Sequence, residues 1–92
     1  MELDLGDVTL EGLLWLLDDA EFHEKHTEEN ICEAIKRWSN KKEERRLAWP
    51  TIFMRLHVHK LRLSYRERLG LDYPALLMSP DCFALIAQRR WK

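Results

Sequence analysis

Apolar residues recur at helical spacing through most of this chain of 92 residues. The leucines between Leu10 and Leu17 fall on one face of a helix, and the apolar residues between Ile31 and Trp38 do the same. Only three glycines and three prolines interrupt the chain, which favours helices over a turn-rich β architecture. The sequence therefore predicts an all-α fold, and its length suits one domain spanning residues 1–92.

Helix start and stop signals divide the chain into a small helical bundle. We expect four main helices, near residues 8–24, 28–39, 50–69 and 80–90, with short helical pieces near 42–48 and 74–78. Thr27, followed by two glutamates, is a good N-cap for the second helix. Pro50 and Gly70 suit the first turn and the end of the third, and Pro80 suits the first turn of the last.

The third expected helix, residues 50–69, carries apolar residues on two opposite faces. Met54 and Val58 lie on one face, and Ile52 and Leu56 lie on the other. A helix that is apolar on two sides is typical of the centre of a bundle. Alternation of apolar and polar residues also fits a β-strand here, but the alternation changes phase at His59, so the helix explains more residues.

Charge is divided unequally along the chain. Residues Met1 to Ile35 include eleven acids and one lysine, a net charge of −10, whereas Lys36 to Lys92 include five acids and fourteen bases, a net charge of +9. The total of −1 hides this division. Two interpretations follow: the acidic helices pack beside the basic helix and the charges face each other within the fold, or the polarised surface recognises a partner.

The function that these features favour is a non-enzymatic protein–protein interaction module, a small adaptor or inhibitor. Opposed acidic and basic faces would guide it to a larger protein, or to a second copy of itself in a dimer, and Trp and Arg side chains would anchor it. The expected partner-binding residues are Arg55, Arg62, Arg66, Arg89, Arg90, Trp91, Glu28 and Glu29.

Nucleic acid is the alternative partner. The arginines Arg55, Arg62 and Arg66 would form a stripe along the helix 50–69 that could contact phosphates. Two features count against a nucleic-acid-binding regulator. The acidic half opposes the field of the basic half, and the pI of about 6.4 is lower than is usual for such domains. No helix-turn-helix pattern is evident either.

Histidines and cysteines suggest a metal site only weakly. His23, His26 and Cys32 do not match a known zinc spacing, so we expect no metal and interpret the two histidines as exposed at the end of a helix. His57 and His59, two residues apart, would point about 160° away from each other on a helix and could not share an ion. We expect no cofactor.

The chain carries no signature of an enzyme, a secreted protein or a membrane protein. It lacks a glycine-rich phosphate loop, a nucleophile elbow and an HExxH motif. Cys32 could act as a nucleophile with a histidine base, but a lone buried cysteine usually has a packing role. The first residues lack the basic segment of a signal peptide, and Glu11 interrupts the apolar stretch before it could span a membrane. Cys32 and Cys82 are expected to be free, buried thiols in a cytoplasmic protein.

Overall fold

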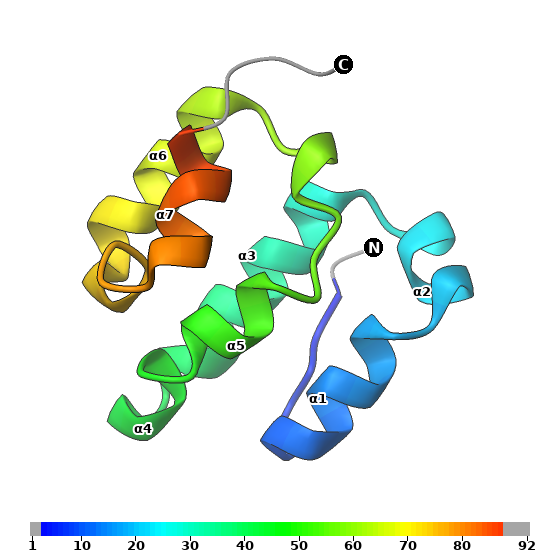
Figure 1. Cartoon of the computed structure of the whole chain (residues 1–92). Helices are drawn as coiled ribbons and strands as arrows, with labels where there is room; N and C mark the ends of the chain where they lie inside the picture. The colour runs from blue at the N-terminus through cyan, green and yellow to red at the C-terminus, as the bar shows by residue number, and fades with distance from the viewer. Residues whose placement is uncertain (1–2, 88–92) are drawn as a thin grey trace.

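Helices form the whole regular structure of residues 3–87, which are the residues that the computed structural model describes (Figure 1). Within them the α-helices and two 3₁₀ turns are, in order, α1 Leu10–Leu17, α2 Ala20–Lys25, α3 Glu28–Ser39, α4 Glu43–Arg46, α5 Trp49–Phe53, η1 Val58–Lys60, α6 Leu63–Asp72, η2 Pro74–Leu76 and α7 Pro80–Ala87. No strand occurs among the described residues. The predicted all-α fold is confirmed.

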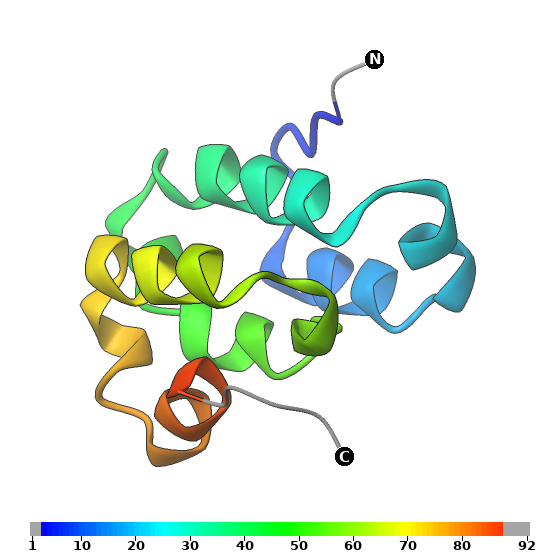
Figure 2. The same cartoon turned by 90° about the horizontal axis from the view of Figure 1, so that it is seen from above.

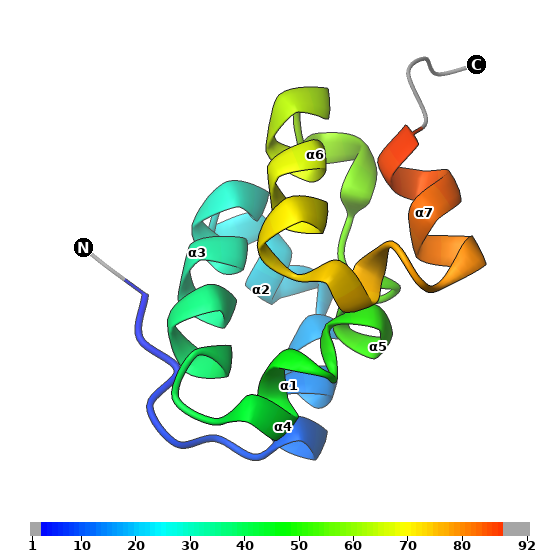
Figure 3. The same ribbon diagram turned by 90° about the vertical axis from the view of Figure 1, so that its left-hand side faces the viewer.

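Helix α3 lies between the N-terminal helices α1 and α2 and the C-terminal helix α6. In Figure 1, α1 and α2 lie on one side of α3 and α6 lies on the other. The view from above in Figure 2 and the side view in Figure 3 place α6 between α3 and α7, so α7 packs on the face of α6 that is turned away from α3. The acidic first half and the basic second half of the chain therefore meet along α3.

Side-chain caps fix where the first three helices begin. The Thr9 hydroxyl accepts the backbone N–H of Gly12 at 3.1 Å, and the Thr27 hydroxyl accepts that of Asn30 at 3.1 Å. The Asp19 carboxylate accepts the N–H of Glu21 at 3.0 Å. Each cap satisfies a backbone donor that the helix itself leaves unpaired.

Two tryptophans lie at the centre of the core. Trp38 of α3 and Trp49 of α5 are buried, and each indole N–H has an acceptor: Val8 O at 2.7 Å for Trp38 and the Ser39 hydroxyl at 3.0 Å for Trp49. Because buried indoles require such acceptors, these bonds hold the N-terminal segment and α5 against α3. The other large, fully buried side chains are Leu13, Ile31, Ile35, Ile52, Phe53, Leu69 and Leu76.

The predicted single helix over residues 50–69 is wrong. Helix α5 ends at Phe53, an irregular segment containing η1 follows, and α6 begins only at Leu63. The irregular segment still buries both Leu56 and Val58 in the core. The pattern of apolar residues on two faces thus reflects a segment that crosses the core without being a helix.

Several other boundaries also differ from the expected ones. The helix expected over residues 8–24 is divided at Asp18 and Asp19 into α1 and α2. Gly70 does not end a helix but lies inside α6. The prediction of residues 28–39 is confirmed by α3, and the last helix begins at Pro80 as expected, while its predicted end at residue 90 lies outside the described residues.

Candidate functional site

Ion pairs join the acidic half of the chain to the basic half. The Arg55 guanidinium donates to the Asp18 carboxylate at 2.8 Å across 37 residues of sequence. Arg62 donates to both carboxylate oxygens of Glu29, at 2.8 and 3.3 Å, across 33 residues. Both pairs are largely exposed, so each contributes only modestly to stability. The interpretation that the two charged halves face each other is supported by these contacts.

A third contact between the halves is partly buried. The Tyr65 hydroxyl of α6 donates to the Glu33 carboxylate of α3, and Lys36 also approaches Glu33 at 3.2 Å. The hydrogen bond from Tyr65 lowers the pKa of Glu33, and burial together with that bond raises the pKa of Tyr65. This contact fixes the orientation of α6 on α3.

The expected partner-binding residues do not form one surface. Arg55, Arg62 and Glu29 are engaged in the ion pairs across the halves, as described above. Arg66, expected on an exposed stripe, is buried and donates to the carbonyl oxygen of Leu85 at 3.2 Å. The stripe does not exist because the helix that would carry it is interrupted.

Glu28 is buried as well, and the remaining predicted residues cannot be placed. Its carboxylate is turned into the fold. Glu28, like Arg66, was expected to bind a partner but is buried and not available to one. Arg89, Arg90 and Trp91 lie outside the described residues.

The carboxylate of Glu28 is the centre of a cluster with His23 and His57. Its two oxygens lie 3.0 and 3.1 Å from Nδ1 of His23, and one of them accepts the backbone N–H of His57 at 2.7 Å. Nε2 of His23 lies 2.7 Å from the carbonyl oxygen of Leu17. The rings of His23 and His57 stack, with centroids 3.8 Å apart and planes 14° from parallel. We call these three residues the histidine–glutamate cluster.

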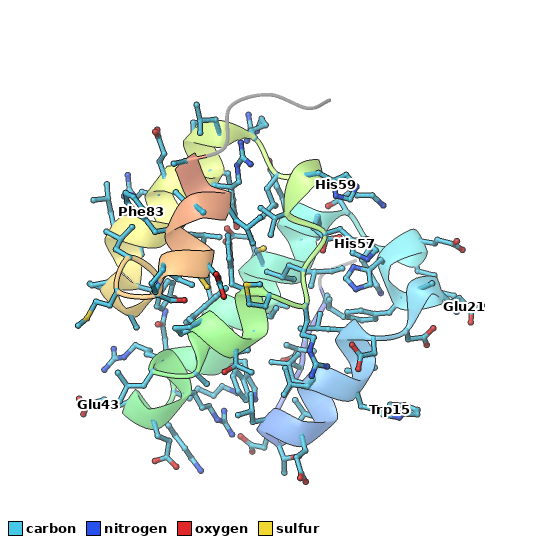
Figure 4. The ribbon with its side chains drawn as sticks, viewed as in Figure 1. Trp15, Glu21, Glu43, His57, His59 and Phe83 are labelled. Atoms are coloured by element: carbon cyan, nitrogen blue, oxygen red, sulfur yellow. The ribbon has the colours of Figure 1, made fainter. Side chains whose placement is uncertain are left out.

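Three elements that are distant in sequence supply this cluster. The six-residue helix α2 carries His23, the first turn of α3 carries Glu28, and the segment before η1 carries His57. Figure 4 shows His57 on the irregular segment, on the side that faces α2. Burial, followed by the nearby charge of His23, lowers the pKa of His57. The cluster therefore links both halves of the chain through titratable groups.

The sequence-based interpretation of the histidines needs two corrections. His23 is buried with 4% of its surface exposed, rather than lying at a solvent-exposed helix end, and His26 is half-buried with its ring 5.2 Å from that of Phe22. His57 and His59 are not on one α-helix, so their rings lie 5.9 Å apart and 21° from parallel instead of pointing apart. No local spacing relates His23 to His57, so only the tertiary fold could reveal their contact.

Cys32 cannot act as a nucleophile in this structure. It is fully buried in the core, and burial together with the charge of Glu28 raises its pKa far above the ordinary range of a thiol. Cys82 is buried too, and burial raises its pKa. Both thiols are free, as expected.

Large apolar side chains are exposed where α6, η2 and α7 meet. Met78 is 84% exposed, Leu71 72%, Phe83 53% and Leu77 41%. Leu77 lies over Gly70, since a Cβ placed on that glycine would be 2.9 Å from Leu77 Cδ2. We call these four side chains the apolar corner. In Figure 4, Phe83 lies on the opposite side of the molecule from Trp15 of α1, which is the exposed tryptophan of the described residues.

Comparisons with known proteins find no relative: no family model, no curated protein and no solved structure matches this chain. Among residues 3–87, no helix has the length and apolar character needed to cross a membrane.

Proposed function

We propose that this chain is a non-enzymatic protein-binding module, a small adaptor or inhibitor, that binds its partner through the apolar corner. The observation that carries the proposal is the exposure of Leu71, Leu77, Met78 and Phe83 within one short stretch of chain. Exposed apolar side chains that gather in one place are typical of protein-binding surfaces, whereas single exposed ones need no explanation.

The surroundings of the apolar corner fit such a surface. Arg68 and Asp72, which are 3.5 Å apart, lie on α6 with Leu71, and the exposed Asp81 lies on α7 with Phe83. Apolar residues with charged neighbours resemble the apolar centre and polar rim of a protein interface. The partner we propose is another protein that presents an apolar surface to this corner.

The pairing of charges across the fold favours a protein over nucleic acid as the partner. Arg55 and Arg62 already contact carboxylates of the same chain, and Arg66 is buried. Phosphates would have to compete with Asp18 and Glu29 for these guanidinium groups.

Free buried thiols at Cys32 and Cys82 support a cytoplasmic setting for this activity.

Partner capture with surface variants tests the proposal. The full chain, Met78→Asp and Trp15→Asp are each immobilised and exposed to extract from the native source, and retained proteins are identified by mass spectrometry. A charge at Met78 would disrupt an apolar interface, whereas Trp15→Asp changes an equally exposed side chain on α1. We expect a protein that the wild type and Trp15→Asp retain and Met78→Asp loses.

Two other results would count against this function. Loss of the partner on Trp15→Asp with retention on Met78→Asp would move the binding surface to α1. Retention of the wild type on duplex or single-stranded nucleic acid, weakening steeply as salt rises, would favour the nucleic-acid regulator instead. Sizing of the wild type and Met78→Asp in solution shows whether a second copy is the partner.

A further inference from the structure

We propose that the histidine–glutamate cluster binds a divalent transition-metal ion, for which zinc is the best match, through His23, Glu28 and His57. The ligand atoms of the three side chains all lie within 4.8 Å of one another. Two imidazoles and a carboxylate are a ligand set that zinc binds in proteins, with water completing the coordination.

The orientation of His23 is that of a metal ligand. Its Nε2 must carry a hydrogen, because the Leu17 carbonyl oxygen at 2.7 Å can only accept. In the neutral ring, Nδ1 then presents a lone pair toward the carboxylate of Glu28, a contact that requires a positive charge between them. Histidines that bind metal ions commonly donate their other N–H to a backbone carbonyl in this way.

Glu28 is already close to the position that an ion would require. Ligand atoms about 2.0–2.1 Å from a tetrahedral zinc ion lie roughly 3.3 Å apart. The Glu28 oxygens are 3.0 and 3.1 Å from Nδ1 of His23, closer than that spacing, so the carboxylate has to move away from Nδ1 to admit the ion. The backbone N–H of His57 holds one carboxylate oxygen in place at 2.7 Å.

His57 must turn to become the third ligand. Its ring is stacked on that of His23, so the lone pairs of the two rings run nearly parallel rather than converging on one point. The ring is half-buried and lies on the irregular segment between α5 and η1, where rotation does not disturb a helix.

Bound in this place, the ion would hold the acidic and basic halves together. Its ligands come from α2, from the first turn of α3 and from the segment before η1. His57 is half-buried, so the cluster is not fully enclosed on that side. Such a site would stabilise the fold that presents the apolar corner, without depending on which partner binds there.

Zinc titration of the chelator-treated full chain tests the site. We expect calorimetry at pH 7.5 to show one zinc ion per chain and a rise in melting temperature on binding. His57→Gln should weaken zinc affinity by at least about tenfold, and His59→Gln, a neighbouring exposed histidine, should leave it unchanged. His57→Gln is chosen because His23 and Glu28 are buried and their replacement could unfold the chain.

Nitrogen NMR of the histidine side chains in the wild type gives a second readout that needs no variant. Zinc should leave His23 with a hydrogen on Nε2 alone and with Nδ1 shifted by the metal. Absence of zinc binding, equal affinity in His57→Gln and the wild type, or two ring hydrogens on His23 after zinc is added would each overturn the proposal. In that case a proton, not a metal ion, lies between His23 and Glu28.

Discussion

The side chain of Glu28 joins α3 to α2 and to the segment before η1. It is buried with 3% exposed, and its carboxylate contacts Nδ1 of His23 and the backbone N–H of His57. A buried carboxylate is stable only with such partners, since its desolvation costs several kcal/mol per charge in proteins. Its removal leaves the backbone N–H of His57 without an acceptor and Nδ1 of His23 without its partner.

Replacing Glu28 by Ala should therefore lower the free energy of unfolding by about 3 kcal/mol, the loss typical when one partner of a buried charged pair is removed. Urea denaturation in the presence of a chelator measures it. Glu24→Ala, on the exposed side of α2, is the matched control and should change the free energy by less than about 0.5 kcal/mol. Equal effects of the two substitutions would show that the Glu28 contacts are not formed.

His57 predicts how stability depends on pH. Its pKa is below the ordinary value of 6.5 in the folded chain, so the unfolded chain binds the proton more readily. This contribution to stability is present above pH 6.5 and is lost as the pH falls below 6.5 toward the lower pKa of the folded state.

Urea denaturation between pH 7.5 and pH 5.5 should accordingly show the wild type losing stability on acidification. His57→Gln should lose less over the same interval, while His59→Gln should follow the wild type. Identical profiles for the wild type and His57→Gln would contradict a lowered pKa of His57 in the folded chain.

Among the elements, α3 shows what the sequence can predict. Three signals indicate the same helix: Thr27 as N-cap, the two glutamates that follow it, and apolar residues at regular helical spacing. These signals agree with the fold because α3 is long and buries one face. The segment after Pro50 lacks such agreement: Leu56 and Val58 are both buried although they are two residues apart. Its alternation resembles a strand, yet no partner strand exists in the described residues, so only tertiary packing determines its path.

The cap of α3 can be tested by itself. Thr27→Ala removes the hydroxyl that accepts the N–H of Asn30 at 3.1 Å, and should lower the free energy of unfolding by about 1 kcal/mol. Urea denaturation measures the loss, and Thr51→Ala, at an exposed position within α5, is the control. A Thr27→Ala variant as stable as the control would mean that α3 begins elsewhere.

The candidate sites show the corresponding limit of sequence analysis. The division of charge was visible in the sequence, and the pairs Arg55–Asp18 and Arg62–Glu29 realise it. The contact of His23 with His57 was not predictable, because no local period relates residues from α2 and from the segment before η1. The apolar corner was also missed, since its residues have the same composition as the buried core.

At the scale of the whole molecule, charged groups of the two halves of the chain pair with each other within the fold. The acidic residues of the first half lie beside the basic residues of the second along α3, where ion pairs, the Tyr65–Glu33 hydrogen bond and the histidine–glutamate cluster join them. The apolar corner remains exposed at the junction of α6, η2 and α7. Charged groups thus join the two halves of the chain, and the binding surface that we propose is apolar.

A double-mutant cycle on Asp18 and Arg55 tests whether the two charged halves of the chain meet in this way. The pair is 2.8 Å apart and joins α1 to the segment after α5, so it exists only if the two halves meet as described. Asp18→Arg, Arg55→Asp and the exchanged double variant are compared by urea denaturation at low salt. We predict that the exchange recovers stability relative to the sum of the single changes, with an interaction energy of about 0.5–1 kcal/mol. Strictly additive effects would show that Asp18 and Arg55 do not interact and that the two halves do not meet there.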